Sequence, residues 1–232
     1  MELINIIELY NTVALQLRKH HNGYLTVDDF NLQLGFVEKE LLQMFISMYE
    51  KSQQISEHLT PFKKTKPLSS DKNGWVEYPD DHAYRIVVEG LYVTNPVSEA
   101  TIQRYPCEYL RDHQVIVRLS SKIAAPSMEK KIFYHTFRDG KIKLYPSDLF
   151  FIDYTYFRNP VYGKVKSTPT VVNGEDVETI VEDKPLEWRT ITFKVFVVML
   201  LSKFGVSLKD EPQYYATIQQ MEDYYKKSMN ND

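Results

Sequence analysis

Residues 131–145 read KIFYHTFRDGKIKLY, in which two runs rich in β-branched and aromatic residues flank the pair Asp139-Gly140. Asp-Gly between two such runs is a strong signal for a β-hairpin, because both residues tolerate the positive φ of a tight turn. The runs at 83–93 and 149–157 have a similar composition and predict two more strands. The middle of the chain is therefore expected to hold an antiparallel sheet of about four strands.

The N-terminal part of the chain, residues 1–58, has the periodicity of two helices. Apolar residues recur three and four positions apart, and a polar turn then separates the two helical stretches. Thr26 is placed to cap the second helix, with Asp29 three positions later. We expect this helix to continue to the polar stretch 53–58 and to form an antiparallel hairpin with the first.

Three stretches have no clear period. Residues 59–80 contain prolines and an Asn-Gly pair and are interpreted as a connector, and residues 109–122 are compatible with a short helix. Residues 159–185 form a long, acidic connection of low hydrophobicity. A loop of this length is usually functional, mobile or a small excursion hairpin. The valines on both sides of Asn173-Gly174 would allow such a hairpin.

Two further helices are predicted near the C-terminus. Residues 186–204 follow Pro185, and the run 195–201 is almost entirely apolar, so this helix is expected to be buried or covered by a partner. One face of it should carry Trp188, Ile191, Thr192, Val195, Val198, Met199 and Ser202. The last helix has a stripe of large side chains at Tyr214, Ile218, Met221 and Tyr225.

Together these patterns predict an α+β fold. The N-terminal hairpin and the C-terminal helices, residues 1–58 and 186–228, are expected to form one helical bundle. Residues 59–185, the connector plus an antiparallel β domain with the long loop 159–185, are expected to be inserted between them.

Composition narrows the classes of function. The 232 residues carry a formal net charge of -3, which argues against a surface built throughout to neutralise nucleic-acid phosphates. The single cysteine allows no intramolecular disulfide and no cysteine-based zinc site. The start of the chain lacks the pattern of a secretory signal, and the run 195–201 is far shorter than the roughly 20 residues that a bilayer core needs. The 17 tyrosines suit either a β-rich core, which we favour, or contact surfaces.

A search for site chemistry predicts no catalytic, metal-binding or cofactor-binding residue. The turn around Gly23 resembles half of an EF-hand, but placing Gly23 at loop position 6 puts Arg18 at a position that needs an oxygen ligand. The six histidines include no pair at the i, i+4 spacing of a helical metal site. Nucleophile and phosphate-loop motifs are absent, and Cys107 has no activating context. The sequence therefore favours a protein that is not an enzyme.

Basic and aromatic residues alternate in two places, which would suit a sheet face that follows a nucleic-acid backbone. The alternative, which the negative net charge favours, is the solvent side of a two-faced sheet. The residues concerned are Arg138, Lys141, Lys143 and Tyr145, and Arg158, Tyr162, Lys164 and Lys166.

The order of elements and several short motifs resemble a family of structural proteins from tailed phages of Bacteroidetes hosts, especially the crAss-like phages. The resemblance covers most of the chain. Its motifs are NGYL at 22–25 with Phe30-Asn31, DGKIKLYPSD at 139–148, IDYTYFRNP at 152–160, LEW at 186–188, KFGVSL at 203–208 and QYYA at 213–216.

This resemblance implies a virion protein of the phage neck, a head-tail connector similar in outline to the adaptors of short-tailed phages. Such proteins are not enzymes and need no cofactor. They form a homo-oligomeric ring, typically a dodecamer, between the portal protein and adjacent neck or tail ring proteins, and genomic DNA passes through the lumen without sequence specificity. The implied location is the virion, assembled in the host cytoplasm without a membrane partner. The large middle β region departs from the simplest adaptors and leaves open which ring the chain would form.

Other roles remain open on the sequence alone: a tail tube, tail terminator or minor capsid protein, or an α+β domain that binds nucleic acid. The last predicted helix could dock on a partner ring by inserting into a groove. Its stripe could equally pack on the N-terminal hairpin of its own chain. The candidate docking residues are Tyr214, Tyr215, Ile218, Met221, Tyr224 and Tyr225.

Overall fold

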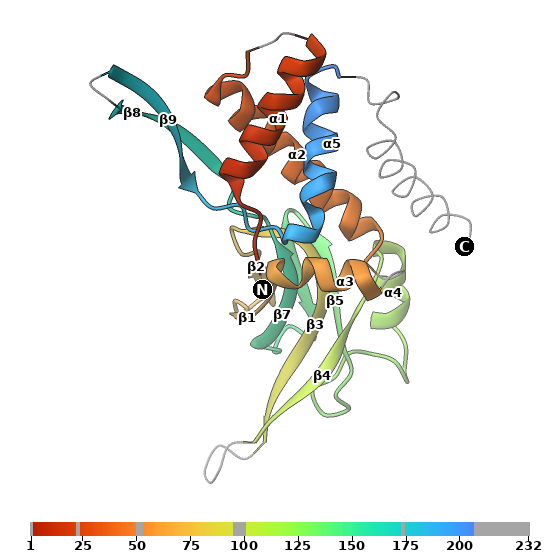
Figure 1. The fold of residues 1–232 in the computed structure, drawn as a ribbon. Helices are drawn as coiled ribbons and strands as arrows, with labels where there is room; N and C mark the ends of the chain where they lie inside the picture. The colour runs from red at the N-terminus through yellow and green to blue at the C-terminus, as the bar shows by residue number, and fades with distance from the viewer. Residues whose placement is uncertain (1, 22–23, 50–52, 95–100, 173–174, 207–232) are drawn as a thin grey trace. The chain divides into compact units, whose positions relative to one another are not determined.

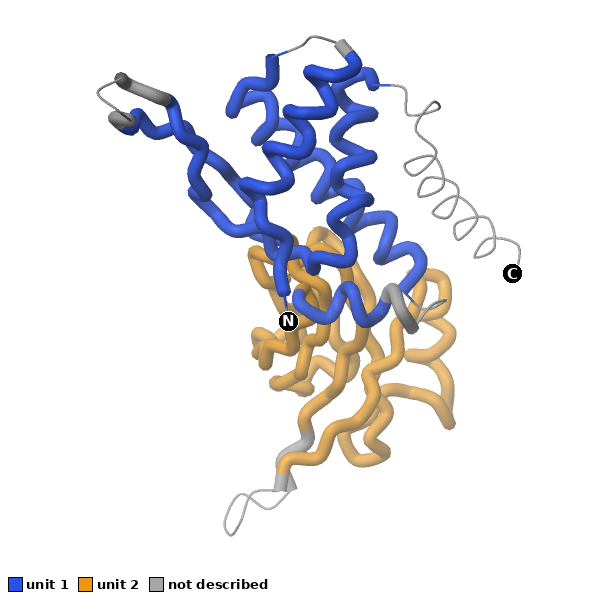
Figure 2. The backbone as a smooth tube through the Cα atoms, viewed as in Figure 1, with its two compact units in different colours: residues 1–61, 160–232 blue, residues 62–159 orange. Residues whose placement is uncertain are grey.

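The computed structural model describes residues 2–21, 24–49, 53–94, 101–172 and 175–206. These residues contain both helices and strands, so the mixed fold class is confirmed at that coarse level. The chain divides into two compact units (Figure 2). Unit 1 comprises Met1–Pro61 and Pro160–Asp232, and unit 2 comprises Phe62–Asn159.

Unit 1 contains four of the described helices: α1 (Ile6–His21), α2 (Val27–Ser47), α3 (Gln53–Leu59) and α5 (Phe193–Lys203) (Figure 1). Both α1 and α2 contact α5. A helix as short as α5 is not stable alone in water, so its packing against the other two must hold it. The buried apolar residues of these three helices include Ile6, Leu9, Val13, Leu17, Phe30, Leu34, Val37, Leu41, Phe196, Val197, Val198, Leu200 and Leu201.

Side-chain caps and one backbone pairing define the ends of these helices. Thr26 Oγ1 accepts a hydrogen bond from the backbone N–H of Asp29 at 3.1 Å, which confirms the predicted cap of α2. Close to the N-terminus, the backbone N–H of Ile4 donates to the carbonyl of Trp188 at 2.9 Å. Residues far apart in the sequence therefore meet just before α1 and just before α5.

The predicted length of the second helix was wrong. Helix α2 ends at Ser47, and α3 is a separate helix of 7 residues. The N–H groups of Met48 and Tyr49 donate to carbonyls of the last turn of α2. Met48 is buried where the chain turns, so apolar residues continue past the end of the helix and hide the break from a periodicity argument.

The predicted start of the helix after Pro185 was also wrong, and its predicted face was right only in part. Residues 186–189 are not helical, a short 3-10 turn follows at Thr190–Thr192, and α5 begins at Phe193. Pairing with the N-terminal residues holds this segment in a non-helical conformation. The buried side of α5 carries Phe196, Val197, Val198, Leu200 and Leu201. Of the residues predicted for the apolar face, Trp188, Thr192 and Val198 are buried, whereas Ile191 is exposed.

The predicted long connection 159–185 contains a β-ribbon that belongs to unit 1. Strand β8 (Lys164–Val172) pairs antiparallel with β9 (Glu175–Lys184), and the two make a sheet of their own. The hairpin allowed by the sequence is thus the alternative that the structure contains. The ribbon is joined to the helices through contacts of β8 with α2 and of both strands with α1.

Unit 2 is built on a sheet of seven strands in the order β1-β7-β3-β4-β5-β6-β2. All neighbours are antiparallel except β4 and β5, which are parallel and are connected through α4 (Asp112–Leu119). The strands are β1 (Lys63–Ser69), β2 (Trp75–Glu77), β3 (His82–Thr94), β4 (Thr101–Tyr109), β5 (Phe133–Arg138), β6 (Lys141–Tyr145) and β7 (Phe151–Arg158).

The predicted hairpin is confirmed, but the expected number of strands was too small. Asp139 and Gly140 both have positive φ, 54° and 71°, between β5 and β6. The predicted connector 59–80 in fact contains β1 and β2. Strand β1 is an edge strand with six of its seven residues exposed, so it carries no apolar alternation that the sequence could show.

One side of the sheet carries the core of unit 2. Gly90 lies where a Cβ would come within 2.7 Å of Cδ2 of Phe133, so only glycine lets β3 approach this ring. The buried residues of the core are Val76, Val88, Cys107, Phe133, Ile142, Leu144, Leu149, Ile152, Tyr154 and Tyr156. Each buried large apolar side chain contributes about 1.5–3 kcal/mol relative to exposure, so unit 2 has a substantial core of its own.

Candidate interaction surfaces

The six docking residues predicted from the sequence lie outside the described residues. They are Tyr214, Tyr215, Ile218, Met221, Tyr224 and Tyr225. The candidate surfaces considered below are therefore those of residues that the structure describes.

The base of the β8–β9 ribbon is held to α2 by a side chain that acts like a strand. Asn31 Nδ2 donates to the carbonyl of Val165 at 2.9 Å, and the N–H of Val165 donates to Asn31 Oδ1 at 2.9 Å. Val165 itself is fully buried. This double hydrogen bond fixes both the position and the direction of β8 on the helix.

A second contact on the same helix involves a buried carboxyl group. The N–H of Gly163 lies 3.3 Å from each side-chain oxygen of Glu38, and Glu38 is 0% exposed. The pKa of Glu38 is raised to about 8, mainly by burial and to a smaller extent by the nearby charge of Glu187, although the hydrogen bond from Gly163 lowers it. At neutral pH the carboxyl is therefore mostly protonated in the folded chain.

The sequence search missed this pair, although a signal for Glu38 exists. Glu38 lies four positions after Leu34 and three before Leu41, and both of these leucines are fully buried, so its helical position alone places it on the apolar side of α2. Gly163 carries no comparable signal. It is needed because a Cβ there would lie 3.0 Å from Ile6 Cδ1 and Leu186 Cδ1.

Beyond its base the ribbon is largely exposed and its strands differ in charge. Lys164 and Lys166 are the only charged residues of β8, whereas the described side chains of β9 include Glu178, Glu182 and Asp183. All five belong to a two-stranded sheet, so each strand has one edge without a strand beside it among the described residues. Figure 1 shows the ribbon extending away from α1 and α2.

Exposed apolar side chains form two further sets, one in each unit. On α2, Leu32 and Phe36 are 57% and 55% exposed and lie one turn apart on the same face. In unit 2, α4 has no buried residue, and Ile116, Val117 and, after the helix, Ile123 are 75%, 67% and 85% exposed. We call these the α2 patch and the α4 patch.

Inside unit 2, Arg85 is enclosed by aromatic rings. Its Cζ lies 4.4 Å from the ring centroid of Tyr109 and 4.7 Å from that of Phe137, and its Nη1 lies 3.1 Å from Nε2 of His135. Burial first, and then the charge of Arg85, lower the pKa of His135 to about 4. The histidine is therefore neutral at physiological pH and can accept a hydrogen bond from the guanidinium.

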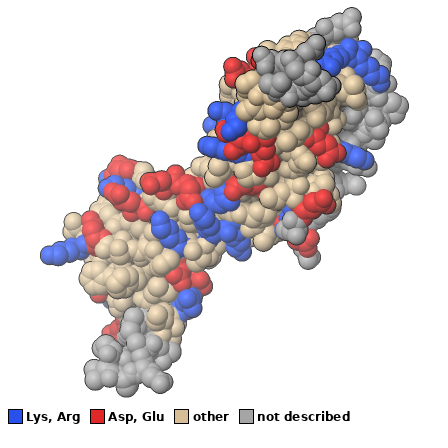
Figure 3. Space-filling model, turned by 60° about the vertical axis from the view of Figure 1, so that its left-hand side comes forward, with Lys and Arg blue, Asp and Glu red and all other residues tan. Residues whose placement is uncertain are grey.

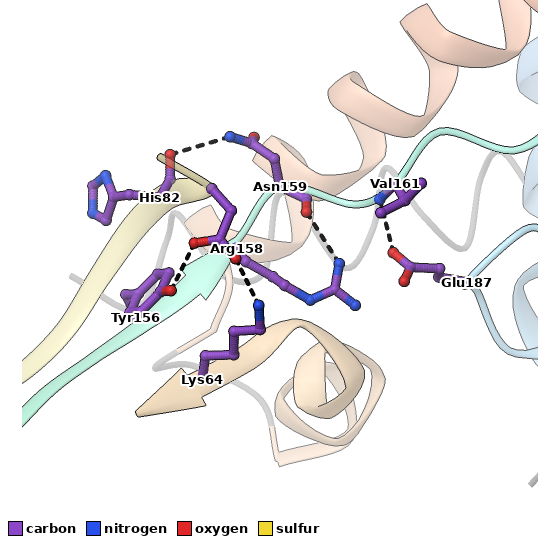
Figure 4. A network of polar contacts seen from close by, with 8 residues as sticks. Lys64, His82, Tyr156, Arg158, Asn159, Val161 and Glu187 are labelled. Atoms are coloured by element: carbon purple, nitrogen blue, oxygen red, sulfur yellow. Dashed lines mark hydrogen bonds and ion pairs between the residues drawn. The ribbon is translucent and has the colours of Figure 1, made fainter. Parts of the chain in front are cut away.

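A neighbouring cluster joins β7 to the residues before β3. Lys64 Nζ and Tyr156 Oη donate to the two carboxylate oxygens of Asp81, each at 2.7 Å (Figure 4). Burial disfavours the charged form of Asp81, but these two hydrogen bonds outweigh it, and the pKa of Asp81 is lowered. Burial raises the pKa of Tyr156 to about 12. The ionised carboxylate is thus used to hold strands of the sheet together.

Several of the basic residues singled out in the sequence have local partners. Lys141 pairs with Glu77 at 2.8 Å, and Lys143 lies over the ring of Trp75, 4.8 Å from its centroid. Lys166 pairs with Asp183 at 3.4 Å. On the face drawn in Figure 3 the two signs of charge are intermixed. These contacts favour the interpretation that the basic residues lie on the solvent side of a sheet, rather than on a surface that follows a nucleic-acid backbone.

Metal and thiol chemistry find no support in the described part of the chain. No group of three or more His, Cys, Asp and Glu residues in it is arranged to hold a metal ion. Cys107 is buried, and burial raises the pKa of its thiol far above the usual range, so it is a poor nucleophile. Among the same residues, no helix combines the length and the apolar character needed to cross a bilayer.

Comparison with known proteins adds no assignment. No protein-family model matches the chain, and a search of curated proteins finds no match.

Proposed function

We propose that the chain is a non-enzymatic virion protein that forms a homo-oligomeric ring in the phage neck and joins the portal to the tail. The observation that carries the proposal is the presence of two distinct exposed apolar patches, on α2 and on α4. A ring is built from head-to-tail contacts, which need two different surfaces on each copy. Exposed apolar side chains that gather in one place are typical of such contacts.

The sequence resemblance supports the same proposal through residues that build the fold. DGKIKLYPSD at 139–148 includes the β5–β6 turn and β6, and IDYTYFRNP at 152–160 includes most of β7. Leu186 and Trp188, from the LEW motif, are buried in unit 1. The motifs therefore belong to the framework, which is the part that a structural family would share.

We also propose an architecture for the subunit: a helical bundle made by both ends of the chain, with residues 62–159 inserted as a β domain. The contacts of α1 and α2 with α5 support it, as does the hydrogen bond between Ile4 and Trp188. In the ring, genomic DNA would pass through the lumen without sequence specificity. A net charge of -3 suits a channel that must not grip phosphates.

The test is electron microscopy with mass measurement on the purified protein, alone and mixed with its phage's portal protein. We expect a closed ring of one copy number, either free or only on the portal. A chain that stays monomeric in both conditions would contradict the proposal. Salt-dependent DNA binding by such a monomer would instead favour the nucleic-acid-binding alternative.

Three variants test whether the α2 patch and the α4 patch form the contacts between copies in the ring. Leu32→Ser with Phe36→Ser, and Ile116→Ser with Val117→Ser, should each reduce ring formation, because each removes an apolar surface that is buried only on assembly. Ile191→Ser is the control, because Ile191 is 65% exposed and lies outside both patches. Equal assembly by all three variants would exclude both patches from the contact.

A further inference from the structure

The β8–β9 ribbon has the properties of a strand pair that is incomplete in the single chain. A two-stranded ribbon is marginally stable in water unless a further strand or a helix covers it. Here Asn31 and Glu38 bind only the base, near residues 163–165. From Lys166 to Thr170 on β8, the described side chains are exposed except for the half-buried Thr168.

The two edges of the ribbon have opposite charge. Strand β8 carries Lys164 and Lys166 and no acid. On β9, Glu178, Glu182 and Asp183 are exposed, as is the one base of the strand, Lys184. These four side chains carry a net charge of -2, and Asp183 also pairs with Lys166 of its own ribbon at 3.4 Å. A strand edge of this kind repels a copy of itself and attracts the other edge, so the favoured neighbour of β8 is a second β9.

Along the ribbon, Glu182 of β9 lies between Lys164 and Lys166 of β8 in height. In the ribbon Val165 is opposite Glu182, and Lys166 is opposite Val181. When copies stand side by side at the same height, as rotation about a ring axis requires, Lys166 of one copy is level with Val181 of the next and adjacent to its Glu182, whereas Lys164 is level with Lys184. Pro169 lacks an N–H donor, so the contact is expected on the side of Pro169 that is nearer the helices.

We infer that the ribbons of neighbouring copies pair edge to edge, with β8 of one copy against β9 of the next. The partner is therefore a second copy of this chain, and the inference rests on the proposed ring. Each copy then contributes the edge of β8 to one neighbour and the edge of β9 to the other, so the pairing continues around the ring and leaves no strand edge free. The contact is head-to-tail, as ring closure requires.

A charge-swap experiment tests the inference. The β8 variant is Lys164→Glu with Lys166→Glu, which makes both edges acidic. The β9 variant is Glu178→Lys with Glu182→Lys, which leaves Asp183 as the one acid among residues 178–184 and makes this part of β9 basic, like β8. Each alone should need at least about tenfold more protein for half-assembly than the unchanged chain, because attraction at every contact becomes repulsion. An equimolar mixture of the two should assemble again, since every contact then joins opposite charges.

The control is Lys63→Glu with Lys66→Glu on β1, which changes the net charge by the same amount as the β8 variant. Both lysines are exposed. This control should assemble like the unchanged chain. Circular dichroism of each variant checks that the fold is kept.

The outcomes separate this inference from the proposed function. Rings that form equally well from every variant would overturn the ribbon contact and leave the ring intact. Failure of the mixture to assemble, with both variants folded, would also overturn it. Open polymers from the unchanged chain that the swap variants lose would support the ribbon contact and contradict the closed ring. A chain monomeric under all conditions, with or without the portal, would overturn both.

Discussion

Glu38 makes the stability of unit 1 depend on pH. Its carboxyl is 0% exposed and has a pKa of about 8, against an ordinary value of 4.5. An acid whose pKa is raised in the folded state binds its proton more tightly when folded. Below about pH 4.5, Glu38 therefore does not lower the free energy of unfolding. As the pH rises from there toward 8, Glu38 lowers the free energy of unfolding increasingly, and above pH 8 this effect is constant.

Replacing Glu38 by glutamine should stabilise the protein at neutral pH. The amide oxygen of the glutamine still accepts a hydrogen bond from the N–H of Gly163. Unlike the carboxyl group, the amide is uncharged without binding a proton. At pH 7 the free energy of unfolding should rise by about 3 kcal/mol, and at pH 4 it should change by less than about 1 kcal/mol. Urea unfolding followed by circular dichroism at several pH values measures both.

The matched control for this prediction is Glu40→Gln, on the same helix. Glu40 is exposed and pairs with Lys203 at 2.7 Å. Its replacement should cost at most about 1 kcal/mol, as for other surface ion pairs. A Glu38→Gln variant that is less stable than the unchanged chain at every pH would show that the carboxyl has a partner favouring its charged form.

At the scale of elements, the ribbon is attached to α2 through few contacts. Asn31 supplies two hydrogen bonds to the backbone of Val165, in place of the strand that would otherwise lie there. The strands β1 and β9 show two ways in which this chain treats a free edge. Strand β1 carries lysines and a proline, which protect an edge from pairing, whereas the charges of β9 are acidic except for Lys184 at its end and can be neutralised by a basic strand.

Asn31→Ala should loosen the ribbon while leaving the helices folded. Loss of two partly buried hydrogen bonds should lower the free energy of unfolding by about 2 kcal/mol. Hydrogen exchange should accelerate at the amides of β8 and β9 more than in α1 or α5. Lys39→Ala, an exposed change on the same helix, is the control and should leave these rates unchanged. Uniform acceleration in all elements would contradict the view of the ribbon as a separately attached element.

At the scale of the whole molecule, each unit has its own buried core, and the chain passes between them at residues 61–62 and 159–160. Unit 1 is assembled from two segments that are distant in the sequence. The contact between α1 and α5, and the backbone pairing of residues 2–4 with 188–190, join them.

Limited trypsin digestion should cut first in the ribbon, where Lys164, Lys166 and Lys184 are exposed. The two fragments should nevertheless remain together, because the α1–α5 contact does not depend on an intact ribbon. Size-exclusion chromatography of the digest, with a denaturing gel of each fraction, makes the comparison. Separate elution of the N-terminal fragment would contradict the proposed bundle of both chain ends.

Local signals predicted the local parts of this fold well. The cap at Thr26, the Asp139-Gly140 turn, and the strands around 83–93 and 149–157 all depend on residues within a few positions of one another. The start of α5 failed for the opposite reason. Residues 186–189 have an acceptable helical pattern, but pairing with residues 2–4 holds them out of the helix.

By itself the sequence determined the helix-and-strand character of the chain, its main turn and its lack of site motifs, since these follow from side-chain period and turn chemistry. Only the tertiary structure decided that β1 forms a sheet edge, that β4 runs parallel to β5, and that the 159–185 segment is a ribbon on α2. An exposed edge strand buries too little to show a period, and a pairing between distant segments depends on which surfaces meet. The contact of Gly163 with Glu38 and the enclosure of Arg85 belong to the same class, because each joins residues that are remote in the chain.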